Sequence, residues 1–89
     1  MQKLNQQQNK LKESIIQKRV RLLYEKDGWL VVKFIQTTKN GWPDLGCFKN
    51  SIAVFIETKA TGKTASPLQL YRHKQLRQKG FTVLTKDSI

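Results

Sequence analysis

The chain has 89 residues, of which 17 are Lys or Arg and 6 are Asp or Glu, so its formal net charge is +11. This length allows one domain with a modest core, and a hydrophobic share of 38% is typical of a folded protein, not of a disordered tail. So high a charge indicates an acidic partner, first of all nucleic acid, whose phosphates attract dispersed Lys and Arg. A merely soluble basic surface is the plainer alternative. A membrane role is disfavoured, because no apolar run approaches the roughly 20 residues of a bilayer span.

The first ten residues, MQKLNQQQNK, hold few apolar side chains. They predict a loose basic arm over 1–10, followed by a single domain over 11–89. Because the arm lacks the apolar core of a secretion signal, we expect the chain to stay in the cytoplasm. The one cysteine, Cys47, has no partner for a disulfide or a zinc site, and it is expected to be a buried apolar side chain on a strand.

The first half of the chain predicts a helix and then a strand. Ile16, Val20 and Leu23 recur at the spacing of one helix face, so residues 11–26 are expected to be helical. The segment WLVVKFI, residues 29–35, is dense in β-branched and aromatic residues and predicts a largely buried strand.

The second half predicts two strands, a helix and a last strand. Strands over 45–48 and 51–59 are expected to pair through a two-residue turn at Lys49-Asn50. The sequence SPLQ then forms a capping box with Pro at the first helical position, which predicts a helix over 67–79. Residues 81–84 complete the domain as a short strand. The expected fold is α/β, with a small mixed sheet flanked by two helices in the order αβββαβ.

Two carboxylates stand near the end of the most apolar strand. With a turn at Lys49-Asn50, antiparallel pairing places Asp44 opposite Phe55, so that Asp44, Glu57 and Lys59 share one face of the sheet. Two neighbouring carboxylates without His or Cys favour a hard divalent cation such as Mg²⁺ or Mn²⁺, and the Lys59 ammonium can reach the same spot. Alternatively, Asp44 is a turn residue and Glu57 forms a simple pair with Lys59.

Glu13 is a third candidate acid. It lies within about 60° of Ile16 and Val20 on the first helix, so its carboxylate starts on the inward side. The plainer alternative is a first-turn acid favoured by the helix dipole. Glu25 falls off this stripe and is expected to be ordinary surface charge.

The second helix carries residues with two possible uses. Gln69 is explained by the capping box alone, yet it could also reach substrate or a bound water. His73 is expected to be exposed on a basic helix rather than catalytic. Trp42 and Tyr71 could stack on bases, although packing in the core or at an interface is the more common use.

Taken together and in this order, these residues resemble the VRR-NUC domain, the virus-type replication-repair nuclease branch of the PD-(D/E)XK superfamily. The resemblance spans about residues 11–84. It rests on Glu13, GWPDL at 41–45, the apolar strand leading to Glu57-Thr58-Lys59, Gly62, Pro67, Gln69, Leu76 and Gly80.

The resemblance implies a restriction-endonuclease-like core and a DNA endonuclease that depends on Mg²⁺ or Mn²⁺. Stand-alone members of this size look like bacteriophage proteins, and they are associated with homodimers that act on branched DNA such as four-way (Holliday) junctions. The implied metal ligands are Glu13, Asp44, Glu57 and the carbonyl of Thr58, and the implied catalytic residues are Asp44, Glu57, Lys59 and Gln69.

Two other functions compete with a nuclease. A non-catalytic basic module that binds nucleic acid would use Glu57 and Lys59 as a structural pair. A small basic assembly protein of ribosomal type would need no acidic cluster at all. The small size of the chain independently favours pairing with a second copy, because an oligomer buries more apolar surface.

Overall fold

The computed structural model describes residues 10–89, so the arm expected over 1–10 lies outside the described residues except for Lys10. Four strands form one sheet in the order β1-β2-β3-β4, in which β1, β2 and β3 are antiparallel and β4 runs parallel to β3. This mixed α/β fold confirms the order αβββαβ. The elements are α2 (Glu13–Lys26), β1 (Leu30–Lys33), β2 (Leu45–Lys49), β3 (Ile52–Thr58), α3 (Pro67–Gln78) and β4 (Thr82–Lys86).

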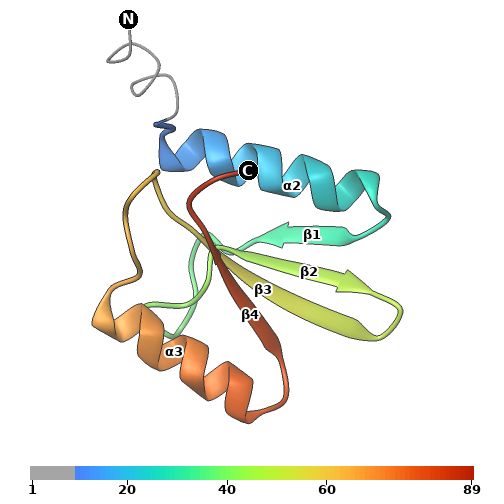
Figure 1. The fold of residues 1–89 in the computed structure, drawn as a ribbon. Coiled ribbons are helices and arrows are strands. Elements are labelled where there is room, and N and C mark those ends of the chain that lie inside the picture. The colour runs from blue at the N-terminus through green and yellow to red at the C-terminus, as the bar shows by residue number, and fades with distance from the viewer. Residues whose placement is uncertain (1–9) are drawn as a thin grey trace, which may run out of the picture.

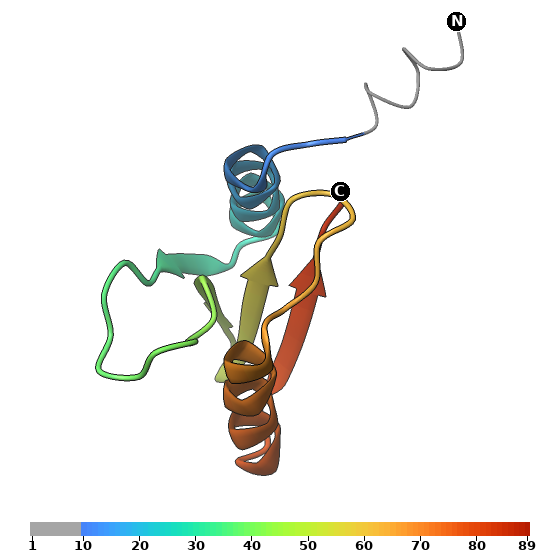
Figure 2. The same cartoon turned by 90° about the vertical axis from the view of Figure 1, so that its left-hand side faces the viewer.

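The two helices lie on opposite faces of the sheet, as Figures 1 and 2 show. Side chains of β3 alternate between the two layers, so its C-terminal half, residues 55–58, is buried on both sides. The strand is apolar over residues 52–56 and ends in the buried polar residues Glu57 and Thr58. The cluster under α2 consists of Ile16, Val20, Leu45, Cys47 and Ile56. The cluster under α3 consists of Phe55, Leu76 and Val83. Cys47 is therefore the buried strand residue that was expected.

The capping box at the start of α3 is confirmed. The Ser66 hydroxyl accepts a hydrogen bond from the Gln69 backbone N–H, and the Gln69 side-chain oxygen accepts one from the Ser66 backbone N–H. These two bonds satisfy donors that a helix N-terminus would otherwise leave unpaired. The helix ends at Gln78, one residue before the predicted end. Within residues 10–89 no helix has the length and apolar character that crossing a membrane requires.

The turn between β2 and β3 lies one residue later than expected. Asn50 and Ser51 have positive φ values of 51° and 64°, and the last pair of the hairpin is Lys49 with Ile52. Positive φ at both central residues is typical of a type I′ turn, whose twist matches that of the strands. The predicted turn at Lys49-Asn50 is therefore wrong.

The later turn shifts the strand register by two residues. Phe55 lies opposite Gly46, and Leu45 lies opposite Ile56, so the predicted pairing of Asp44 with Phe55 is wrong. A shift of two residues preserves the alternation of side chains, whereas a shift of one would reverse it. Asp44 and Glu57 consequently remain on the same side of the sheet, and they are closer to directly opposite than diagonal.

β1 is shorter and more exposed than expected. It covers only Leu30–Lys33, and it forms an edge of the sheet, where the Leu30 side chain is 67% exposed. Because α3 packs near β4 at the other edge, it leaves this part of the sheet uncovered. The prediction of a largely buried strand over 29–35 is therefore wrong. The last strand also starts later than predicted, at Thr82, and continues to Lys86.

Candidate active site

Asp44 stands immediately before β2 and is held through its side chain. Its Oδ2 accepts hydrogen bonds from the Thr58 backbone N–H (2.8 Å) and from the Thr58 hydroxyl (2.9 Å). The same hydroxyl accepts a hydrogen bond from the Gln17 side-chain amide of α2 (3.0 Å). On the other side, the Asp44 carbonyl accepts a hydrogen bond from the Phe34 N–H (2.8 Å). The carboxylate is thus tied to β3 and, through Thr58, to α2.

Glu57 is held by side chains of α3, the helix on the other face of the sheet from α2. Its side chain is 1% exposed, and its two oxygens have separate partners on α3. Gln69 donates its side-chain amide to Oε2 (3.1 Å), and His73 Nε2 lies 3.3 Å from Oε1. Gln69 and His73 are four residues apart, so they lie on one face of the helix. The Gln69 amide therefore caps α3 with its oxygen and contacts Glu57 with its nitrogen.

The pKa of Glu57 is raised from 4.5 to about 8. Burial is the largest cause, and the nearby Asp44 adds to it, both through repulsion between the carboxylates and through a side-chain hydrogen bond that requires a proton on one of them. The Lys59 ammonium acts in the opposite direction, while Glu13 raises the pKa further. An acid with this environment favours either a proton or a bound cation.

His73 is buried as a neutral ring. Burial lowers its pKa, and the charges of Arg77 and Lys59 lower it further. When Glu57 is ionised, its carboxylate can only accept hydrogen bonds, so His73 Nε2 must be the donor. Nδ1 is then an unprotonated acceptor, and it is buried without a hydrogen-bond partner among residues 10–89. The expectation that His73 is exposed is wrong, because this side chain is 1% exposed.

The remaining predicted site residues surround this pair at different depths. Lys59 is partly buried, and its backbone N–H is bonded to the Lys86 carbonyl (2.9 Å). Glu13 is exposed in the first turn of α2, and its charge is felt at Glu57. In the part of the chain that the structure describes, no three His, Cys, Asp or Glu side chains are grouped as metal ligands. Asp44 and Glu57 therefore come together, but Glu13 does not join them in one ligand group.

Two residues of the site were not predicted. His73 belongs to a stripe with Gln69 and Leu76 at positions i, i+4 and i+7, and this spacing indicates a buried face. Gln17 lies one turn after Glu13, on the same side of α2. The helical spacing of His73 and of Gln17 can be seen in the sequence. This spacing does not show which strand residue each polar side chain contacts.

Trp42 is packed against other aromatic rings, whereas Tyr71 and Glu25 lie at the surface. Trp42 is partly buried and packs edge-on against Phe34 and Phe55, with ring centroids 6.3 and 5.7 Å away. Tyr71 is 54% exposed and lies under the Arg72 guanidinium. Glu25 is exposed and forms an ion pair with Arg21, as expected of surface charge.

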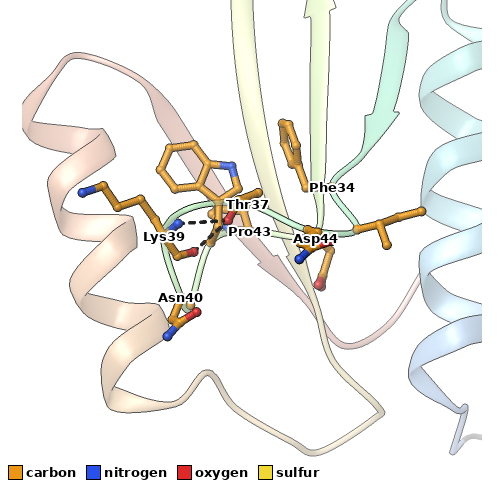
Figure 3. Close-up of a pocket in the computed structure, with 10 residues that line it drawn as sticks. Phe34, Thr37, Lys39, Asn40, Pro43 and Asp44 are labelled. Carbon is orange, nitrogen blue, oxygen red and sulfur yellow. Dashed lines mark hydrogen bonds between the residues drawn. The ribbon is translucent and has the colours of Figure 1, made fainter.

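A hollow of about 310 Å³ opens beside Asp44, inside the loop that joins β1 to β2 (Figure 3). All of its lining residues lie between Phe34 and Asp44 in the sequence. The loop is attached to α3, because Arg72 donates to the Asn40 carbonyl (2.8 Å) and Gly41 packs against Leu68. Gly41 has a φ of +80°, and an added Cβ would lie 2.8 Å from Leu68 Cγ, so glycine is required there.

Comparisons with known proteins agree with this fold. No family model matches the chain. The chain is 33% identical over 79 residues to "Putative nuclease p44" of Acyrthosiphon pisum secondary endosymbiont phage 1, covering 88% of this chain and 85% of that protein. A solved structure described as "VRR_NUC domain" superposes with a TM-score of 0.79 at 29% identity, covering 85% of this chain and 84% of the other.

The fold and these relatives define a small α/β protein of the nuclease class. The chain belongs to the VRR-NUC family.

Proposed function

We propose that the chain is a Mg²⁺- or Mn²⁺-dependent endonuclease that hydrolyses phosphodiester bonds of DNA. The observation that carries this proposal is the pair formed by Asp44 and Glu57, in a chain with a net charge of +11. Two acids that repel each other at a partly buried site are stabilised together when a cation neutralises both. The basic surface around them supplies general attraction for nucleic acid.

The donor groups present fit a hard divalent cation. Such ions prefer oxygen ligands, and Mg²⁺ is commonly held by one or two carboxylates together with waters and substrate phosphates. Asp44 Oδ2 accepts two hydrogen bonds from Thr58, each oxygen of Glu57 has one partner on α3, and the two acids share a hydrogen bond while Glu57 is protonated. Free lone pairs therefore remain on both carboxylates. We propose the Thr58 carbonyl as a further ligand and Glu13 as an acid outside the inner ligand set.

A bound cation would polarise the scissile phosphate and lower the pKa of an attacking water. Lys59 would neutralise charge that develops on the phosphate oxygens or orient the water. Gln69 and His73 would keep the Glu57 carboxylate in one orientation, and Thr58 would do the same for Asp44. Such preorganisation by the residues behind a ligand is worth about 10- to 100-fold in metal affinity or activity.

We further propose that two copies act together on branched DNA. A domain of 89 residues buries limited apolar surface by itself, and Leu30 and Ile35 are 67% and 87% exposed around β1. A two-fold dimer would present two identical sites, which suits a symmetric four-way junction. If the chain is phage-encoded, like its relative, it would act in the cytoplasm of the host cell.

Cleavage of labelled four-way, nicked and linear DNA tests this function. Wild-type protein is expected to cut the four-way junction with Mg²⁺ or Mn²⁺ and not with EDTA, and Lys59→Ala is expected to lose cutting while retaining DNA binding. Lys74→Ala, an exposed lysine on α3, is the matched control and should cut like wild type. Equal cutting of the three DNAs would remove branch selectivity, and wild-type cutting that is unaffected by EDTA would remove the metal-dependent mechanism.

A further inference from the structure

A groove between α2 and β1 brings three cationic side chains to one side of the acid pair. We call it the α2–β1 groove, and its volume is about 230 Å³. Its walls come from α2, from the last residue of β1 and from the first residue of β2. The lining residues are Ser14, Gln17, Lys18, Arg21, Lys33 and Leu45.

The α2–β1 groove adjoins the acid pair. Leu45, in its wall, directly follows Asp44 and pairs across the sheet with Lys33. Gln17, also in its wall, donates to the Thr58 hydroxyl that is bonded to Asp44. The groove is therefore connected to the Asp44 carboxylate by two successive hydrogen bonds.

Two cations of the groove are available to bind an external anion. Arg21 is paired with Glu25 at 2.9 Å. Among residues 10–89, by contrast, no acid lies within salt-bridge distance of Lys18 or Lys33, and both are exposed. They converge from two different elements, so an anion between them would meet both charges. Phosphate is the anion that a nuclease must bring to its acids, and it binds Lys as a point charge.

The hollow on the other side of Asp44 is less suited to phosphate. Lys39 is the single cationic residue among those that line it. Its aromatic rings, Phe34 and Trp42, pack against Phe55 and are not free to stack on bases. The distribution of charge about Asp44 therefore favours the side of α2 and β1.

We propose that the α2–β1 groove binds phosphate groups of the DNA strand next to the scissile bond, through Lys18 and Lys33. This proposal rests on the proposed nuclease function and specifies where its substrate lies. Contacts with phosphate position a strand without reading its sequence. Loss of these lysines should consequently weaken affinity and raise KM for all sequences alike, with little change in kcat.

The test compares two double variants that remove the same charge. Lys18→Ala/Lys33→Ala changes the groove, and Lys74→Ala/Lys79→Ala changes exposed positions on and just after α3. Binding of labelled four-way DNA is measured by fluorescence anisotropy in EDTA over a series of salt concentrations. Because each phosphate contact contributes a slope of about −0.9, the groove variant should reduce the slope of log K against log [salt] by about 1.8. The control should reduce it by less than half as much.

Thermal melts of both variants should match that of wild type, because all four lysines are exposed. Equal slope changes in the two variants would show that the basic charge acts diffusely and would overturn the proposal, as would absence of DNA binding by wild type. The binding measurement uses no metal and no cleavage. A wild-type protein that binds through the groove but never cuts would therefore refute the proposed function and leave this inference standing.

Discussion

Each carboxylate of the acid pair is held by a different helix, through amide, hydroxyl and imidazole groups. Asp44 is linked to α2 through Thr58 and Gln17, and Glu57 is linked to α3 through Gln69 and His73. The arrangement brings two like charges together and offers each a hydrogen-bonded environment in the ionised form. At the scale of residues, the first consequence concerns His73.

Replacing His73 by Phe should lower kcat by about 10- to 100-fold, because Glu57 loses the donor that fixes its Oε1. His73→Gln should retain most of the activity, because a Gln amide nitrogen offers a donor at a similar reach. Single-turnover rates and the Mn²⁺ concentration for half-maximal rate measure the effect. Leu76→Ala, which alters the same face of α3 without touching Glu57, controls for lost stability; equal activity of the Phe and Gln variants would contradict a positioning role.

The free energy of unfolding of the metal-free protein should fall as pH rises from about 6.5 to about 8. Glu57 ionises near 4.5 when unfolded but only near 8 when folded, so the folded chain holds an extra proton across this window. When the folded state binds more protons, stability falls with rising pH. Below 6.5 the lowered pKa of His73 acts in the opposite sense, because the unfolded ring then binds the proton.

Urea unfolding in EDTA at several pH values measures this slope. Glu57→Gln should flatten it, because the residue no longer ionises, and Mn²⁺ in place of EDTA should flatten it in wild type by stabilising the carboxylate. Asp27→Asn, at an exposed acid, should leave the slope unchanged. A wild-type stability that rises steadily over the window would contradict the assigned environment of Glu57.

At the scale of elements, the sequence predicted correctly those features that depend only on neighbouring residues of the chain. The SPLQ capping box and the apolar run of β3 are stretches whose own residues form the cap or fill both layers. The turn was misplaced because Asn50 fits either of two adjacent turns, and only the paired strands select the one with Ser51. The burial of His73 agrees with the helical spacing of α3, although this spacing does not identify Glu57 as its partner. The exposure of β1 was missed because it depends on which edge of the sheet α3 covers. That choice is tertiary and leaves no local pattern.

Gly41→Ala should destabilise the protein more than Gly62→Ala. Both glycines have positive φ, +80° and +84°, which costs an alanine about 1 kcal/mol in each case. At Gly41 the new Cβ would also meet Leu68, whereas nothing lies within 4 Å at Gly62. Overpacking of this kind adds about 1 to 3 kcal/mol.

Urea unfolding of the two glycine variants measures this difference. The Gly41 variant should also cut DNA more slowly, because the displaced loop carries Asp44 at its end. Similar stability of the two variants would show that the loop between β1 and β2 does not depend on its packing against α3.

At the scale of the whole molecule, a small domain with exposed apolar side chains around β1 should form a dimer. Light scattering of the purified chain is expected to give twice the mass of one chain at the concentrations used for cleavage. Leu30→Lys, at a 67% exposed position on the edge strand, should shift the population toward monomer through charge repulsion and lost apolar contact. Lys10→Ala is a control outside the sheet. A monomeric wild type would contradict the proposed two-site arrangement.

The central claim is that Asp44 and Glu57 together bind one divalent cation in the folded protein. Isothermal titration calorimetry of Mn²⁺ into wild type, Asp44→Asn and Asp27→Asn at neutral pH tests it most directly. Wild type and the Asp27 variant should bind Mn²⁺ with the same affinity, and the Asp44 variant should bind it at least tenfold more weakly. Equal binding by all three proteins, or no binding by wild type, would contradict the claim.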